Sequence, residues 1–293
     1  MVGVRHPMRQ LRVFLEIVKF EHTIFALPFA YLGMVLAARG WPGWRIFLWI
    51  TVAMAAARTL AFSVNRLADR FYDARNPRTQ GRPLPRGEIS PAVVRAIAAV
   101  ALGVLTLAAW QLNRFVLALL PAAVIFLVGY SYTKRFTWAS HWILGFTDGM
   151  AVAGAWAAVT GSLAHPAPCL LWLTVTFWMA GFDIIYACQD TEFDRREGLH
   201  SVPARFGNAI ALRLAKANHV LTVLLLAAAG LSLGLGWPFW AGVLLVAGLL
   251  WWENSLVKPD DLSRVNLAFF NVNGYISVLI FVAACADIVI SLQ

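Results

Sequence analysis

The sequence is poor in charged residues. Asp, Glu, Lys and Arg make up only 13% of its 293 residues, whereas hydrophobic residues make up 60%. A soluble domain averages about 25% charged and 45–50% apolar residues. Together with a mean hydropathy of +0.69, this balance excludes an ordinary soluble globular domain and predicts a multi-pass membrane protein.

Cysteine is also scarce, and the placement of the three cysteines indicates neither a metal site nor a disulfide. Cys169, Cys188 and Cys285 lie in or beside apolar segments, without the spacing of a metal site. We therefore expect unpaired thiols. The sequence contains no cluster of His and Cys residues that would predict a zinc site. Because no linker or shift in composition marks a second domain, residues 1–293 are expected to form a single integral-membrane domain.

Nine apolar runs predict helices. A membrane-spanning helix needs about 20 mostly apolar residues, and irregular backbone cannot face lipid. We therefore predict an all-α bundle of about nine transmembrane helices. The N-terminus imitates a signal peptide, but because many apolar runs follow it, an uncleaved first helix is expected. The predicted helical cores are residues 23–38, 46–64, 92–110, 115–132, 142–161, 170–188, 218–234, 239–252 and 267–290.

Membrane topology explains the net charge of +9. Basic residues of membrane proteins collect in cytoplasmic loops. With the N-terminus in the cytoplasm, all but four of the 24 Lys and Arg residues lie on the cytoplasmic side or in the N-terminal segment. We expect the inner membrane as location and the lipid bilayer as surroundings, with no nucleic-acid partner and no obligate protein partner. The four exceptions are Arg39, Arg45, Arg58 and Arg114.

Two polar stretches interrupt the apolar pattern on this cytoplasmic side. Residues 65–87 read NRLADRFYDARNPRTQGRPLPRG, and residues 190–207 read DTEFDRREGLHSVPARFG. Each follows an apolar run and combines acidic residues four apart with a basic loop that contains Pro and Gly. We interpret the two stretches as halves of one diphosphate-binding site.

A partial repeat relates the two stretches. Arg58 precedes Asn65 by seven positions, and Asp183 precedes Asp190 by seven positions. Both sets end an apolar run and enter a basic loop. The repeat predicts two four-helix halves followed by a ninth helix.

The acidic residues of the two stretches have the spacing of oxygen ligands. At about 100° per residue, Asn65, Asp69 and Asp73 fall within roughly 80° of one another on a helical face. Asp190 and Asp194 form the matching pair on the sixth helix. Oxygen donors with room for water suit Mg²⁺, which completes its shell with substrate phosphates. The plainer alternative is that these acids solvate helix ends and pair with arginines, but two such sets on one face favour a metal site.

Basic residues near the two stretches are candidates to hold phosphate oxygens. The guanidinium of Arg is suited to forked contacts with phosphate. The enrichment of positive charge in cytoplasmic loops is an alternative explanation for each of them. The candidates are Arg78, Arg82, Lys134 and Arg135.

Two ionisable residues lie deeper, about two turns inside their helices. A charge within the membrane is costly and usually marks a substrate cavity. Arg58 and Asp183 are therefore candidate functional residues, the alternative being a structural pair. A buried Arg58 could receive the carboxylate of an aromatic acid. Asp148, in the fifth predicted helix, is a weaker candidate.

Four segments resemble the UbiA superfamily of intramembrane aromatic prenyltransferases. The similarity extends over nearly the whole chain, including the number of helices. The segments are NRLADRFYD (65–73), RTQGRPLPRG (78–87), YTKRFTW (132–138) and FDIIYACQDTEFDRREGLHS (182–201).

This resemblance implies an all-helical bundle around a central cavity, with Mg²⁺ as cofactor. It further implies a polyprenyl diphosphate donor and an aromatic acid acceptor, 4-hydroxybenzoate or a hydroxynaphthoate-type precursor, in ubiquinone or menaquinone biosynthesis. The first motif of the family, NDxxDxxxD, maps onto Asn65, Asp69 and Asp73. The second motif, DxxxD, maps onto Asp190 and Asp194.

The resemblance also assigns roles to individual residues. Arg58 matches an arginine that lies near the aromatic acceptor in the family. Arg66 stands where many members carry Asp, which leaves the number of bound ions open. The implied mechanism needs aromatic side chains to shield an allylic cation. The candidates are Tyr130, Tyr132 and Tyr186.

Two other functions remain as alternatives. A membrane transporter could combine half-repeats with intramembrane charge, but its binding site would lie at the midplane between broken helices, which the sequence does not indicate. The second alternative is a prenyltransferase of the same fold that acts on a haem, chlorophyll or lipid precursor.

Overall fold

The computed structural model describes Glu16 and residues 23–291 of the chain. The basic N-terminal segment, which the predicted topology places in the cytoplasm, lies outside these residues. The helices are α2 (Thr23–Ala38), α3 (Trp44–Arg75), α4 (Pro91–Leu112), α5 (Arg114–Thr133), α6 (Ser140–Thr160), α7 (Pro166–Ala187), α8 (Thr191–Glu197), α9 (Val202–Phe206), α10 (Asn208–Leu233), α11 (Trp237–Leu256) and α12 (Asn273–Ser291).

The predicted all-α membrane architecture is confirmed. Eight helices of the described chain are long and apolar enough to cross a membrane. The first predicted run forms α2, which has 16 residues. Apart from an isolated bridge between Lys258 and Asp261, the described residues form no β structure. The three cysteines are free thiols, as expected.

Two helices begin elsewhere than predicted. α10 begins at Asn208, ten residues before its predicted apolar core. The added segment is rich in Ala and amphipathic, since Ala211 and Ala215 are buried whereas Arg213 is exposed. The last run, predicted to be a helix from residue 267, begins with a π-helical segment, Leu267–Val272. There Asn273 donates a hydrogen bond of 3.1 Å to the carbonyl of Ala268, five residues earlier. This side-chain bond accompanies the local departure from regular helix.

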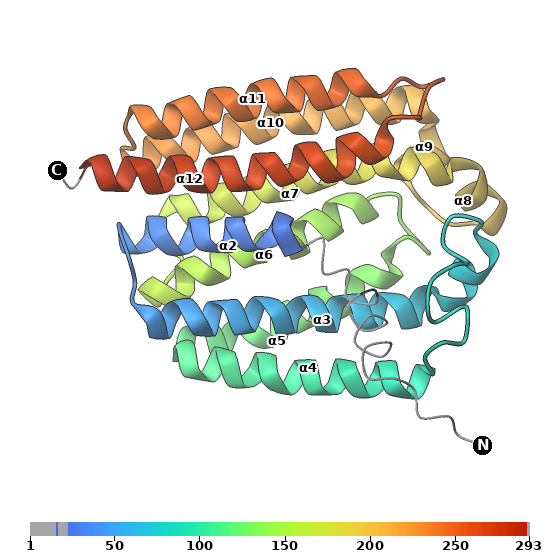
Figure 1. Cartoon of the computed structure of the whole chain (residues 1–293), viewed down its shortest axis with the longest axis horizontal. Coiled ribbons are helices and arrows are strands. Elements are labelled where there is room, and N and C mark those ends of the chain that lie inside the picture. Colours follow the sequence, from blue (N-terminus) through green and yellow to red (C-terminus); the bar gives the residue numbers. More distant parts are fainter. Residues whose placement is uncertain (1–15, 17–22, 292–293) are drawn as a thin grey trace.

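The helices run side by side along one direction (Figure 1). In this view α10 and α11 lie at the top, α12 and α7 overlap below them, α2 and α6 follow, and α3, α4 and α5 lie at the bottom. Helix α7 packs against both α6 and α10, whereas α3 packs against α4 and α5. The loop after α3 and the short helices α8 and α9 lie together at one end of the bundle (Figure 1). The two polar stretches therefore meet at the same end.

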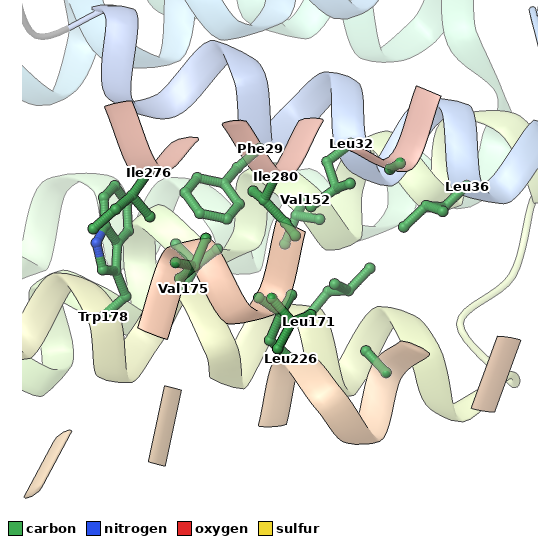
Figure 2. Close-up of a cluster of buried hydrophobic side chains, with 14 of the residues drawn as sticks. Phe29, Leu32, Leu36, Val152, Leu171, Val175, Trp178, Leu226, Ile276 and Ile280 are labelled. Atoms are coloured by element: carbon green, nitrogen blue, oxygen red, sulfur yellow. The ribbon is translucent and has the colours of Figure 1, made fainter. Parts of the chain in front are cut away.

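Apolar side chains from six helices, α2, α6, α7, α10, α11 and α12, form the largest core. Figure 2 shows these side chains converging between α2, α6, α7, α10 and α12. Because every helix contributes only one stripe of side chains, the core fixes the rotation of each helix about its axis. The labelled members are Phe29, Leu32, Leu36, Val152, Leu171, Val175, Trp178, Leu226, Ile276 and Ile280.

Candidate active site

Helix α3 continues past its apolar run and carries the first acidic set. Asn65, Asp69 and Asp73 all lie before its end at Arg75, and the two aspartates are buried, with 3% and 5% of their surface exposed. The side-chain amide of Asn65 donates a hydrogen bond of 3.1 Å to Oδ2 of Asp69. The predicted spacing therefore places these oxygen ligands along one side of a helix.

The second acidic set does not lie on one regular helix. Helix α7 ends at Ala187, and a 3-10 turn, η2 (Cys188–Asp190), connects it to α8. The Thr191 hydroxyl donates to the carbonyl of Cys188 at 3.0 Å, as short polar side chains often do where a helix is interrupted. The helical segment Pro166–Glu197 thus includes Asp190 and Asp194, as predicted, but a 3-10 turn interrupts its regular geometry just before Thr191. Asp194 accepts a hydrogen bond of 2.8 Å from the Ser201 hydroxyl.

The two polar stretches contact each other directly. Arg78 donates from Nε to Oδ1 of Asp190 at 3.0 Å, and from Nη1 to the hydroxyl of Tyr186 at 3.0 Å. Asn76 donates to the same Asp190 oxygen at 3.0 Å. These bonds connect residues 108 to 114 positions apart in the sequence. Asn76 was not recognised in the sequence, where only its place between an acidic helix and a basic loop could have indicated it.

Three of the predicted phosphate ligands form ion pairs with predicted metal ligands. Arg78 pairs with Asp190, Arg82 reaches Asp73 at 2.7 Å, and Lys134 reaches Asp69 at 3.3 Å. The plainer interpretation of the acids, pairing with basic side chains, therefore holds in this structure. Burial would lower the pKa of Arg78, but its hydrogen bonds to Asp190 outweigh that effect and raise the pKa. The guanidinium stays charged and can exchange carboxylate for phosphate oxygens.

Two predicted substrate ligands lie away from the site. Arg135 donates a hydrogen bond of 2.6 Å to the carbonyl of Ala68, and its guanidinium lies 4.9 Å from the ring centroid of Tyr132. Neither Arg135 nor Tyr132 lines the cavities at the site. Arg135, in the turn after α5, therefore supports α3, and Tyr132, near the end of α5, contacts the Arg135 guanidinium. Sequence spacing alone did not indicate either contact.

A cavity of about 720 Å³ extends from the polar site into the apolar bundle. Its wall is mostly apolar and comes from α3, α4, α5, α6 and α7, and Tyr130, Tyr186, Asp148 and Asp183 also face it. A polar pocket of about 220 Å³ adjoins it, and both share Asn65, Arg78, Arg82, Tyr130 and Asp183 in their walls. The polar pocket also contains all four predicted metal-binding aspartates, Asp69, Asp73, Asp190 and Asp194.

Arg58 and Arg66 bring positive charge to the wall of the larger cavity. The guanidinium of Arg58 lies 5.1 Å from the ring centroid of Phe62, and its Nε is buried without a hydrogen bond within the described chain. Arg66 is only 4% exposed and donates to the Asn65 side-chain oxygen at 3.3 Å. Neither arginine makes an ion pair among the described residues. A buried, unpaired guanidinium favours an anionic ligand.

Asp183 does not pair with Arg58, which was the structural alternative for both residues. Its Oδ2 instead lies 2.6 Å from Nδ1 of His141, a buried residue at the start of α6. His141 was not recognised as a site residue, because its partner is 42 positions away and no motif contains both.

The residues present fit Mg²⁺, but they do not form a closed metal cage. No group of three or more His, Cys, Asp or Glu side chains within the described ranges is close enough to hold an ion. The donors are oxygens alone, and the buried Oδ1 of Asp69 has no hydrogen-bond partner. Mg²⁺ typically takes one or two carboxylates and completes its shell with phosphate and water. The open pocket therefore suits an ion that arrives with a diphosphate.

Comparison with known proteins identifies relatives over most of the chain. The model of the UbiA prenyltransferase family matches residues 26–275. A 4-hydroxybenzoate octaprenyltransferase of Cupriavidus necator is 30% identical over 94% of this chain and 96% of its own. The protein of the same description from Aeromonas salmonicida is 31% identical over 84% of each chain.

Solved structures share the fold. The apo structure of a UbiA homologue from Aeropyrum pernix superposes with a TM-score of 0.80 and 30% identity, covering 93% of this chain and 98% of the homologue. A homologue from Archaeoglobus fulgidus bound to GPP and Mg²⁺ has a TM-score of 0.72 at 21% identity, over 94% and 99% of the two chains. At that identity the second likeness shows the fold alone.

Proposed function

This chain belongs to the UbiA prenyltransferase family, and on that premise we propose that it transfers a polyprenyl group from polyprenyl diphosphate to 4-hydroxybenzoate in ubiquinone biosynthesis. Its relatives from Cupriavidus necator and Aeromonas salmonicida, both 4-hydroxybenzoate octaprenyltransferases, favour this acceptor. A hydroxynaphthoate-type acid, which would place the enzyme in menaquinone biosynthesis, is the alternative acceptor.

The polar pocket is the proposed site of the diphosphate. Asn65, Asp69, Asp73, Asp190 and Asp194 would hold Mg²⁺, and all five line that pocket. When bound, Mg²⁺ neutralises the charge that develops on the departing diphosphate.

The basic residues around the polar pocket hold the diphosphate through its remaining oxygens. Each of Arg78, Arg82 and Lys134 now contacts an aspartate. On substrate binding these side chains turn from carboxylate to phosphate, and the aspartates become available to the metal. Because a phosphate oxygen replaces a carboxylate oxygen of the same sign, each basic side chain keeps a negatively charged partner during binding and release.

The larger cavity is the proposed site of the prenyl chain and the acceptor. Its apolar wall suits a hydrocarbon tail. Arg58, with no ion pair in the part of the chain that the structure describes, would bind the acceptor carboxylate. Tyr130 and Tyr186 line the cavity where the allylic cation would form, and aromatic faces attract such cations.

The observation that carries this proposal is the meeting of the two polar stretches. Arg78 and Asn76 bind Asp190, and Arg78 also lines the cavity whose wall contains Arg58. The proposed sites for diphosphate and for an aromatic acid thus adjoin each other.

The test is an assay of purified protein with Mg²⁺, octaprenyl diphosphate and a panel of hydroxylated aromatic acids, with products identified by mass. We expect octaprenyl-4-hydroxybenzoate as the main product. Preferential prenylation of a hydroxynaphthoate would instead assign the enzyme to menaquinone biosynthesis. The absence of any prenylated product would refute the proposed function.

The protein is a multi-pass membrane protein, and we place it in the inner membrane with its polar pocket facing the cytoplasm. The excess of Lys and Arg in the loops at that end supports this orientation. In a variant without native cysteines, Gln80→Cys should react with a membrane-impermeant thiol reagent only after the cytoplasmic side is opened. Ala164→Cys, at the opposite end, should react in intact cells.

A further inference from the structure

His141 connects three segments that come together beside the cavity. It lies in the first turn of α6 and is only 3% exposed. Its Nδ1 lies 2.6 Å from Oδ2 of Asp183 on α7. Its Nε2 accepts a hydrogen bond of 3.2 Å from the backbone N–H of Val202, which begins α9.

These two contacts fix the protonation of the ring. A backbone N–H can only donate, so Nε2 must be an unprotonated acceptor. The proton of a neutral imidazole then sits on Nδ1, which donates to Asp183. His141 therefore holds Asp183 by one oxygen, Oδ2, and cannot itself pass a proton onward through Nε2.

Asp183 faces the place where the two cavities join. It lines both of them, and 26% of its side chain is exposed. Its second oxygen, Oδ1, makes no hydrogen bond that the structure records, and no ion pair joins it to Arg58 or Arg78. An oriented carboxylate with one engaged and one accessible oxygen is suited to accept a proton.

The proposed reaction requires a proton acceptor at this place. The ring of the acceptor forms a bond to C1 of the prenyl chain, and the electron pair of the breaking C1–O bond leaves with diphosphate. The substituted ring carbon must then lose its hydrogen as a proton, and the C–H electron pair restores aromaticity. From the geometry we infer that Asp183 accepts this proton at Oδ1, and that His141 is a positioning residue that holds the carboxylate for this step.

This inference rests on the proposed function and extends it. A merely structural His141 would tie α6, α7 and α9 together without affecting the chemical step. Two substitutions separate its two contacts. In His141→Asn the amide nitrogen takes the approximate place of Nδ1 and can still donate to Asp183. In His141→Gln the amide takes the approximate place of Nε2, so that the contact with Val202 is kept and the contact with Asp183 is lost.

The experiment compares turnover of 4-hydroxybenzoate with that of its analogue deuterated at both positions ortho to the hydroxyl. In the wild type we expect no primary isotope effect, since proton loss from a well-oriented intermediate is fast. His141→Gln should lower kcat by about 10²-fold, in the range that general bases contribute, with little change in either KM and with a primary isotope effect. His141→Asn should retain most of the activity, and Asp183→Asn should lose more than His141→Gln.

His219→Gln is the matched control, because His219 is equally buried but lines neither cavity. It should show no isotope effect, whatever its influence on protein yield. Near-normal turnover in His141→Gln, or a loss without an isotope effect, would overturn the inference. A wild type that prenylates no aromatic acid would instead refute the proposed function.

Discussion

Arg58 is the residue on which acceptor binding depends in this account. It lies seven residues before Asn65, which places it about 10 Å further into the bundle along α3. Arg58 lines the cavity, and its Nε has no hydrogen-bond partner within the described chain. Asp148 interacts with its charge from a longer range but forms no ion pair with it, so that a substrate carboxylate can bind the guanidinium directly.

Arg58→Ala should therefore raise the KM for the aromatic acid by about 10–100-fold, the worth of one charged hydrogen bond. The KM for the donor should change little. Arg70→Ala is the control, because Arg70 lies on the same helix but stacks on Phe71 and lines neither cavity. Steady-state kinetics with each substrate varied in turn measure both constants. A loss of donor affinity alone would contradict the assigned role.

Sequence reasoning was most successful for residues within motifs and failed for residues whose role depends on a distant partner. The spacing of Asn65, Asp69 and Asp73 predicted one helical face, because all three lie on one regular helix. Arg135 and Tyr132 carry the right chemistry, but Arg135 bonds to the backbone of α3 and Tyr132 contacts Arg135, so that neither lines a cavity. His141 could not be found, since the contact that defines it depends on how α6 and α7 pack.

At the scale of elements, α3 connects the polar pocket to the far end of the cavity. Ala53 lines that end, twelve residues or about 18 Å before Asn65. Several other positions of the wall also carry small side chains, including Ala57, Ala61 and Gly154. The missing side-chain volume is space that a long prenyl chain can occupy.

Ala53→Trp should fill this space and shorten the donor that the enzyme accepts. We expect kcat/KM for octaprenyl diphosphate to fall about 10-fold or more, within the range seen when a hydrophobic pocket loses complementarity, while geranyl diphosphate is used as before. Ala55→Trp, on the exposed side of the same helix, should change neither value. An equal loss with both donors would show that the substitution damaged the helix instead.

Close packing of α6 on α7 depends on glycine. A Cβ added at Gly145 would collide with the backbone carbonyl of Thr176, so the two helices could not keep their present separation. Gly145→Ala should therefore destabilise the protein by about 1–3 kcal/mol, the usual cost of overpacking.

The measurement is the midpoint of thermal unfolding in detergent, with Gly103→Ala as control. Gly103 is exposed on α4 and has no atom within 4 Å of the added Cβ. Its replacement should leave the midpoint unchanged or raise it, because Ala favours helix over Gly by about 1 kcal/mol. Equal midpoints for the two variants would argue against a close approach of α6 and α7.

At the scale of the whole molecule, hydropathy predicted the fold class because every membrane-spanning segment must satisfy its own backbone hydrogen bonds. The same reasoning could not detect η2 or the π-helical start of the last helix, since side-chain hydrogen bonds accompany both of these departures. The division into two four-helix halves stays a prediction. The meeting of the two polar stretches followed from topology, whereas the ion pairs that connect them required the structure.

The central claim is that both polar stretches bind one Mg²⁺-diphosphate together. The most direct measurement is the affinity of an unreactive prenyl diphosphate analogue, with and without Mg²⁺, for the wild type, Asp69→Asn and Asp190→Asn. Circular dichroism verifies that both variants remain helical. We predict that Mg²⁺ strengthens binding to the wild type and that each substitution alone removes this effect. Wild-type Mg²⁺-dependent affinity in either variant would contradict the account.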